Sequence, residues 1–575
     1  MRMPPPASRL APGARALGLI ASICAAALAL PAAHAQARPD AGSILRDIQQ
    51  APPQAPRTGP SLPSVPARPA GNPNRTVHFT VVSVQVSGNT AFGSATLVGL
   101  VQGDLIGKSV TLADLQTAAA KITDYYRAHG YMVARAYVPA QRIDATGAHI
   151  EIAVIEGKLG QVTVNNQSRL SEATVARFTA PLHAGALISQ NNLGRQILLL
   201  SDQAGVPPGD GLHAVLRAGQ EPGQSDMGLD IGRAPLATGQ LGLDNYGNAY
   251  TGALRATGQA SLLSPLGLGD VFIFRYIESQ DLYSGTLAAS VPIGGNGLSA
   301  GANYSYTHYK LGGAFASLQD AGTAQSAGAY LAYPWVRTQN YNFNTSLGFD
   351  HRQLYDDIAS TDTVTPRNID VANLTFSGDL RNALAANSVL AWNVAFEAGH
   401  VSINDPNASA ADASGPHTQG NFGKINASAQ YLQAFSPRWS VYGSLTGQLS
   451  NRNLDNSEQL TLGGPYAVRA YPVGEAAGDE GAVGTVELRY TLSPWHDIVP
   501  TLALFVDEGT LRINHSPYAS GSNNLTVGAA GVGFTLARAR DFNVRVYWAV
   551  KVLSSASTSA IDRPNRVWLQ ATKYF

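Results

Sequence analysis

From about residue 235 onward, the chain alternates between apolar and polar residues with a period of two. Turns rich in Gly, Asn, Asp and Ser separate strand-length segments, and no helical period persists. In segment 542–552, every second residue is apolar: Phe542, Val544, Val546, Trp548, Val550 and Val552. Segments 485–492 and 502–507 alternate in the same way. Strands that are apolar on one face and polar on the other are typical of a transmembrane β-barrel.

The length of this region sets the size of the predicted barrel. Residues 235–575 hold about 16 antiparallel strands if each strand with its connection takes roughly 21 residues. A soluble β-sandwich is the alternative, but its inner face forms a dry core. Arg489 and Lys551 fall on the polar face of their strands, where a water-filled lumen accepts charge. We therefore expect an all-β transmembrane barrel.

Residues 77–234 combine helical and strand patterns and repeat them once. The first copy has a strand, a small helix near 93–102, a helix over 111–129 and two more strands. The second copy has the same order, with helices near 171–178 and 189–203. We therefore predict two α+β modules, residues 77–157 and 158–234. The expected strands are 78–89, 131–138 and 149–157 in the first module and 160–165, 213–218 and 227–232 in the second.

The first 35 residues have the pattern of an export signal peptide. Arginines precede an apolar run from Ala16 to Leu30, and Ala33-His34-Ala35 forms a cleavage site of the small-x-small type. A short membrane anchor is the alternative, but the run is too short to span a bilayer and ends at Pro31. Cys24, the only cysteine, lies inside this segment. Cleavage would therefore leave a chain without thiols or disulfides.

Residues 36–50 form a short helical candidate. Ile44, Leu45 and Ile48 share one of its faces. A helix of this length is marginal by itself in water, so it needs a surface on which to dock. Residues 51–76 are rich in proline and predict an extended linker.

The composition argues against a nucleic-acid-binding protein, and the motifs argue against an enzyme. The 39 basic and 39 acidic side chains cancel, so no basic surface for nucleic acid is expected. A G-x-S-x-G pattern at 297–301 begins an alternating strand, whereas a nucleophile elbow needs a strand-to-helix turn. Asp356-Asp357 falls in a polar segment that we interpret as a surface loop. We predict no catalytic residue, no metal ligand and no cofactor.

The order of signal, short helix, Pro-rich linker, two modules and barrel resembles one family, the two-partner secretion transporters or haemolysin activator/secretion proteins. VSGNTAF at 86–92 and VIEGKLG at 154–160 resemble the strand edges of POTRA modules. TGALRATGQASLLSPLGLGD at 251–270 resembles an early barrel segment of the family. GGPYAVRAYPVGEAAGDEG at 463–481 resembles the long loop that folds back into the lumen. The resemblance covers nearly all of the chain beyond the signal.

The resemblance implies a contact inside the barrel. The loop motif is Val468-Arg469-Ala470-Tyr471, with Ala470 in place of the family's glycine, and the wall motif is Phe505-x-Asp507. In this family the loop arginine is thought to contact the inward aspartate, here Arg469 and Asp507. A guanidinium can bind a carboxylate through two parallel hydrogen bonds. A solvated loop charge is the alternative for Arg469. For a pair in a wet lumen, we expect a contribution to stability of about 0–1 kcal/mol.

The resemblance also implies a function and a location. It predicts a transporter in the outer membrane of a Gram-negative bacterium, with the modules in the periplasm and residues 36–50 plugging the lumen. An unfolded exoprotein, of the adhesin or cytolysin type, would bind the modules and pass through the barrel without nucleotide. The other implied partners are outer-membrane lipid, periplasmic chaperones and the barrel-assembly machinery.

Three other classes of membrane protein fit the sequence less well. The insertase branch of the same superfamily carries more than two modules. A passive porin has no reason for modules and a Pro-rich tether, and an autotransporter has a long passenger that this sequence lacks.

Overall fold

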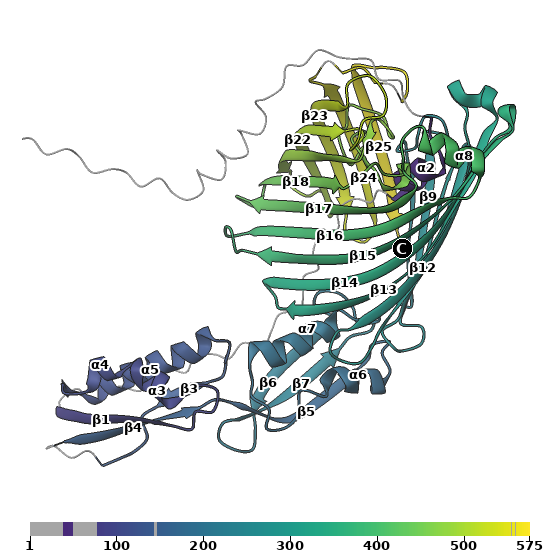
Figure 1. The fold of residues 1–575 in the computed structure, drawn as a ribbon. Helices are drawn as coiled ribbons and strands as arrows, with labels where there is room; N and C mark the ends of the chain where they lie inside the picture. Colours follow the sequence, from purple (N-terminus) through teal and green to yellow (C-terminus); the bar gives the residue numbers. More distant parts are fainter. Residues whose placement is uncertain (1–37, 50–76, 143–146, 554, 558) are drawn as a thin grey trace, which may run out of the picture.

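The computed structural model describes residues 38–49, 77–142, 147–553, 555–557 and 559–575. The expected signal (1–35) and the Pro-rich linker (51–76) lie outside these residues. Figure 1 shows a large barrel with two small α+β modules extending from one of its ends. No helix in the described ranges is both long and apolar enough to cross a membrane.

The C-terminal part is a closed barrel of 16 antiparallel strands, as predicted. Each strand pairs with the next in sequence, and β25 closes the ring on β8 from Gln570↔Asp244 to Tyr574↔Gln240. The strands are β8 (Ala237–Asp244), β9 (Arg255–Leu263), β10 (Val271–Ser279), β11 (Leu282–Pro292), β12 (Ser299–Lys310), β13 (Asp320–Arg337), β14 (Tyr341–Ile358), β15 (Thr363–Arg381), β16 (Ser388–Ile403), β17 (Gly420–Ala434), β18 (Trp439–Ser450), β21 (Glu480–Thr491), β22 (Ile498–Arg512), β23 (Asn524–Arg538), β24 (Phe542–Lys551) and β25 (Asn565–Tyr574).

Alternation along the strands separates an apolar outer surface from the lumen. On β22, Leu504 is 59% exposed on the outer face, whereas Asp507 is fully buried on the inner face. On β24, Trp548 is exposed outside, and Lys551 lies inside over the ring of Tyr471. The period-two pattern therefore placed these side chains on the correct faces. Ser299 of the G-x-S-x-G pattern begins barrel strand β12.

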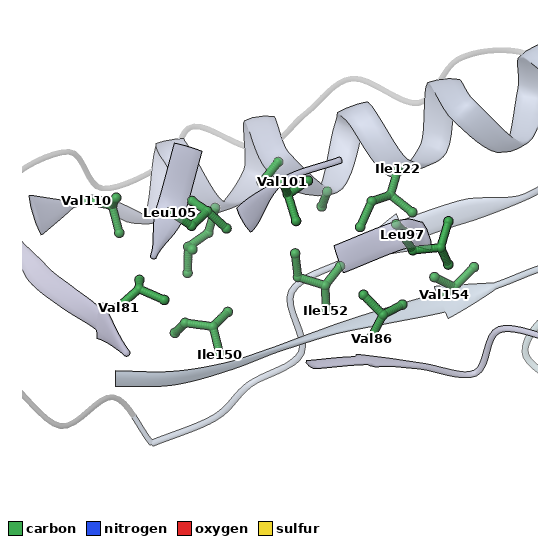
Figure 2. Packing of buried hydrophobic residues seen from close by; sticks show 14 of the residues in the cluster. Val81, Val86, Leu97, Val101, Leu105, Val110, Ile122, Ile150, Ile152 and Val154 are labelled. Carbon is green, nitrogen blue, oxygen red and sulfur yellow. The ribbon is translucent and has the colours of Figure 1, made fainter. Parts of the chain in front are cut away.

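The first module is a four-stranded sheet covered by helices on one face. β1 (Phe79–Ser87) and β4 (Ala148–Ile155) pair in parallel at the centre, with β2 (Ser109–Val110) and β3 (Arg135–Tyr137) at the edges. The helices are α3 (Ser94–Gly99), α4 (Gln102–Leu105) and α5 (Leu112–Ala128). Figure 2 shows their apolar side chains meeting those of the sheet, for example Ile122 of α5 near Ile152 of β4.

The strand expected at 131–138 is shorter than predicted. Only Arg135–Tyr137 pairs with β4. The preceding backbone instead continues the turn after α5, because the Tyr131 N–H donates to the Tyr126 carbonyl and the Ala134 N–H to the Tyr131 carbonyl. The apolar residues of this segment therefore belong to a turn.

Glu156, in the VIEGKLG motif, ties together the two ends of the first module. The N–H groups of Thr90 and Ala91 donate to its carboxylate at 2.6 and 2.7 Å, and the Tyr126 hydroxyl donates at 2.8 Å. Burial alone would raise the pKa of Glu156, but these hydrogen bonds outweigh burial and hold its pKa below the usual value. The VSGNTAF and VIEGKLG motifs therefore meet at one carboxylate.

The second module repeats the parallel pairing with three strands in the order β5-β7-β6. Its elements are β5 (Lys158–Asn166), α6 (Glu172–Thr179), the π-helical turn η1 (Gln190–Gly194), α7 (Arg195–Ser201), β6 (Leu212–Ala218) and β7 (Gln224–Ile231). The single helix expected at 189–203 thus begins with a π turn. Within the described residues, β6 pairs with β7 alone, so its outer edge is free.

The second module docks on the barrel turns that face it. Arg337, at the end of β13, binds Asp202 through two hydrogen bonds of 2.7 and 2.8 Å. Arg195 donates to the Pro334 carbonyl at 2.7 Å. These contacts fix the module beneath the β13 side of the barrel, as Figure 1 shows.

Candidate functional site

The segment between β18 and β21, residues 451–479, folds into the barrel; we call it the lumen loop. A two-residue ladder between β19 (Leu460–Thr461) and β20 (Ala477–Gly478) joins its two arms. Its apolar side chains pack against the barrel wall in one buried cluster. The loop members of this cluster are Leu462, Val468, Ala470 and Tyr471, and the wall members include Phe505, Ala529 and Ala549.

Arg469 reaches Asp507 from the tip of the lumen loop. Its Nε and Nη2 donate to the two carboxylate oxygens of Asp507 at 2.9 and 2.6 Å, and its backbone N–H donates to the same carboxylate at 3.1 Å. The predicted pair is therefore in contact and bidentate.

Two neighbours of Arg469, Glu487 and Trp568, were not assigned from the sequence, whereas Phe505 was expected on this wall. The Arg469 Nη1 donates to Glu487 on β21 at 2.6 Å, and its guanidinium lies 3.4 Å from the centre of the Phe505 ring. The Trp568 indole N–H donates to the Arg469 carbonyl at 2.7 Å. The alternation of apolar and polar residues along 485–492 places Glu487 on the inner face, and this position in the pattern was the signal that could have identified it. Nothing in the sequence pointed to Trp568.

The expectation that this pair lies in a wet lumen was wrong. Arg469 is 4% exposed and Asp507 is fully buried. The loop carries its own apolar residues onto the wall around the pair, and they exclude water. Breaking this pair therefore belongs to the energetic range of buried ion pairs.

The flanking motif residues have distinct positions. Ala470 is fully buried, and its backbone is not in the left-handed region, so a side chain fits where the family has glycine. The Tyr471 hydroxyl donates to the Ser555 carbonyl at 3.1 Å, and the Lys551 ammonium lies 4.4 Å from the centre of the Tyr471 ring. Val468 is buried against the wall. The whole motif thus anchors the loop.

Helix α2 (Ala41–Gln49) lies inside the barrel, and we call it the plug helix. Ile44 and Leu45 are buried, and Ile48 is partly buried. They pack on apolar residues of the wall, which include Tyr309, Leu354, Ile369 and Val401. The face predicted from the sequence is therefore the face that docks.

An arginine on β15 binds three carboxylates at the start of the plug helix. Arg367 donates to Asp40 at 2.7 Å, to Asp356 at 2.8 Å and to Asp455 of the lumen loop at 2.6 Å. Asp356 also accepts the Ala41 N–H at 2.7 Å. The interpretation of Asp356 as a loop surface residue was wrong. It lies on β14 and is 1% exposed, because the strand extends further than its polar sequence suggested.

The plug helix and the lumen loop also contact one another. Arg46 donates to the Asn456 carbonyl at 2.6 Å, and the Asn456 amide donates to Asp40 at 3.2 Å. A Cβ built on Gly42 would lie 2.9 Å from the backbone nitrogen of Ser457, so the absence of a side chain permits this approach. The two segments therefore fill the lumen as neighbours.

The charges in this site pair with one another. In the described part of the chain, no group of three or more His, Cys, Asp or Glu side chains is arranged to hold a metal ion. The geometry instead provides two chain segments held in the lumen by ion pairs and apolar contacts. Such contacts can be broken and remade without covalent chemistry.

Comparison with known proteins identifies two regions. Residues 223–536 match the family model described as haemolysin secretion/activation protein ShlB/FhaC/HecB. Residues 79–157 match the model of a ShlB-type POTRA domain.

Individual relatives extend the match over most of the chain. The heme/hemopexin transporter protein HuxB of Haemophilus influenzae (strain 86-028NP) is 26% identical over 94% of this chain and 95% of its own length. The outer membrane transporter CdiB of Dickeya dadantii (strain 3937) is 24% identical over 79% of this chain and 80% of its own.

Among solved structures, CdiB from Escherichia coli has the same fold. It superposes with a TM-score of 0.73 at 20% identity, over 99% of this chain and 100% of that one. CdiB from Acinetobacter baumannii gives a TM-score of 0.66 at 14% identity, over 90% of this chain and 95% of that one.

Proposed function

The chain belongs to the haemolysin secretion/activation protein family of two-partner secretion transporters, and from this premise we propose how its lumen is gated. It is an outer-membrane protein with periplasmic modules, and its family consists of transporters rather than enzymes. It binds an unfolded exoprotein in the periplasm and secretes it through the barrel without nucleotide.

We propose that the plug helix and the lumen loop are the gate. One observation carries the proposal: both segments fill the lumen and share contacts through Arg367, Asp455 and Asn456. A polypeptide chain can pass only if the plug helix leaves. Arg469, held by Asp507 and Glu487, keeps the loop on the wall while this happens.

A reversible covalent lock tests this gate. An ideal Cβ on Gly42 lies 3.1 Å from the Ser457 Cβ, and a shift of a few tenths of an ångström reaches the spacing of about 3.5–4.5 Å found in disulfides. Cys24 is the only native cysteine and lies in the expected signal, so Gly42→Cys with Ser457→Cys has no competing thiol. Under oxidising conditions, cells that carry this double variant should stop secreting the exoprotein, and a reductant should restore secretion.

Each single-cysteine variant is the matched control and should secrete under both conditions. Normal secretion by a chain shown to be fully cross-linked would overturn the gate.

Capture of the exoprotein begins, in this proposal, at a module edge. The outer edge of β6 is free within the described residues, and Val215 on this strand is exposed. An extended peptide can add to such an edge through main-chain hydrogen bonds, which tolerate varied sequences. This mode suits an unfolded partner.

The partner is, in this proposal, a large secreted adhesin or cytolysin. Periplasmic chaperones and the barrel-assembly machinery would deliver the transporter itself to the membrane. An exoprotein concerned with heme or hemopexin is a second candidate, because a relative that spans 94% of this chain is named a heme/hemopexin transporter.

A further inference from the structure

The surface beneath the start of the plug helix holds three carboxylates and one guanidinium. They belong to Asp320, Asp356 and Arg367 of the barrel wall and to Asp455 of the lumen loop, and we call these four residues the plug cradle. All four side chains are buried. Asp356 and Asp455 both bind Arg367, whereas Asp320 has a different partner.

The partner of Asp320 is Arg38, from the plug segment. The second carboxylate oxygen of Asp320 is buried and has no hydrogen-bond partner. When the plug helix leaves, Arg38 leaves with it, and Asp320 faces the lumen without its cation. The departing plug also removes the Ala41 N–H from Asp356. The empty cradle therefore exposes a carboxylate that has lost its charge partner and a second one that has lost a donor.

We propose that the plug cradle is a peptide-binding site for a cationic residue followed by a short amphipathic helix. At rest it holds residues 38–49 of this chain. During transport it holds a segment of the exoprotein with the same chemistry; this second half rests on the proposed function.

The contacts define what such a ligand must present. A Lys or Arg side chain meets Asp320, and a backbone N–H three residues later donates to Asp356, as Arg38 and Ala41 do. Two adjacent apolar side chains then enter the pocket of Ile44 and Leu45, lined by Tyr309 and Leu354. A cation is the essential part, because leaving a carboxylate buried without one is costly.

The test uses a synthetic peptide as the probe. The chain lacking residues 36–50 is reconstituted in planar bilayers, and a peptide with the sequence of residues 36–50 is added. We expect a saturable, salt-sensitive fall in single-channel conductance. The Arg38→Ala peptide should need at least about ten times the concentration for the same block. Gln49→Ala is the matched control, since Gln49 is exposed, and should block like the parent peptide.

Exchanging the charges of residues 38 and 320 distinguishes specific binding of the peptide at the cradle from nonspecific obstruction of the channel. Asp320→Arg in the barrel should weaken block by the parent peptide and restore block by the Arg38→Asp peptide. Heat-modifiability on a gel verifies that the Asp320→Arg barrel is assembled. Equal block by a scrambled peptide, or no recovery in the exchanged pair, would refute the site.

The outcome is independent of the proposed gate. Secretion by the chain lacking residues 36–50, together with an absence of peptide block, would leave the gate intact and remove the binding site. If the peptide blocks the channel but the disulfide lock has no effect on secretion, the binding site stands and the gate is overturned.

Discussion

Replacing Arg469 by alanine should destabilise the barrel much more than replacing Arg489, an arginine on the same wall. Without Arg469, the fully buried Asp507 keeps only the Thr485 hydroxyl, at 2.9 Å, and a backbone N–H as donors. Loss of one partner from a buried ion pair costs about 3–5 kcal/mol in unfolding free energy. Arg489 is about one-third exposed and forms its ion pair with Glu487, and its guanidinium lies 4.3 Å from the centre of the Tyr442 ring. Its removal should cost about 1 kcal/mol or less.

Arg469 and Asp507 should not contribute equally to the free energy of unfolding. Asp507→Ala leaves Arg469 bound to Glu487, so it should be milder than Arg469→Ala. The double variant removes both members of the bidentate pair and leaves no buried charge of that pair without a partner. Its cost should therefore fall short of the sum of the single variants, by about 1 kcal/mol or more.

The assay is urea unfolding of the refolded chain in lipid vesicles, followed by the heat-dependent shift in gel mobility. Secretion of the exoprotein is measured in parallel and should fall with both Arg469→Ala and Asp507→Ala, because the lumen loop loses its anchor. Unfolding of Arg469→Ala at the same urea concentration as Arg489→Ala would show that the pair does not stabilise the barrel. Costs of the Arg469 and Asp507 variants that simply add would show that the two residues do not act as a pair.

Three further outcomes follow from other parts of the molecule. Deleting residues 36–50 should raise single-channel conductance in planar bilayers, and unchanged conductance would mean that the helix does not obstruct the lumen. A soluble fragment of residues 77–234 should bind the unfolded N-terminal region of the exoprotein, and deletion of either module should stop secretion while the barrel still assembles. Because the pKa of Glu156 is lowered, its contribution to stability is present above its ordinary pKa of 4.5 and is lost as the pH falls through the folded-state value. The fragment should therefore lose stability below about pH 4.5, and Glu156→Gln should flatten that slope in denaturant titrations across this range.

The period-two alternation of apolar and polar residues was enough to predict the barrel and the face on which each wall side chain lies. A strand that faces lipid on one side and a lumen on the other must alternate, so the outward phase of Leu504 fixed the inward phase of Asp507. The loop contact itself came from motif resemblance, because nothing in local sequence says that residues 38 positions apart meet. The burial of that contact could not be read from either source, since it depends on how the loop packs.

The ion pairs around Arg367 could not be predicted from the sequence. They join Asp40, Asp356, Arg367 and Asp455, which come from four separate segments and are each, in their local sequence, ordinary polar residues. Asp356 was misassigned because β14 extends to Ile358, into a stretch whose polar composition is typical of a loop. Long-range ion pairs of this kind leave no periodic trace in the sequence.

The uneven distribution of charge along the lumen has a consequence for movement without nucleotide. Arg367 and Asp356, which hold the plug helix, lie near the ends of their strands far from the modules. Nearer to the modules, one continuous row of inward positions crosses four strands without a charge: Ser377, Asn393, Ser428 and Thr446. Hydroxyl and amide groups exchange hydrogen bonds with a passing backbone at little net cost, whereas an unpaired charge would retain an oppositely charged segment. A chain that enters from the modules therefore passes this uncharged row before it reaches the ion pairs that hold the plug helix.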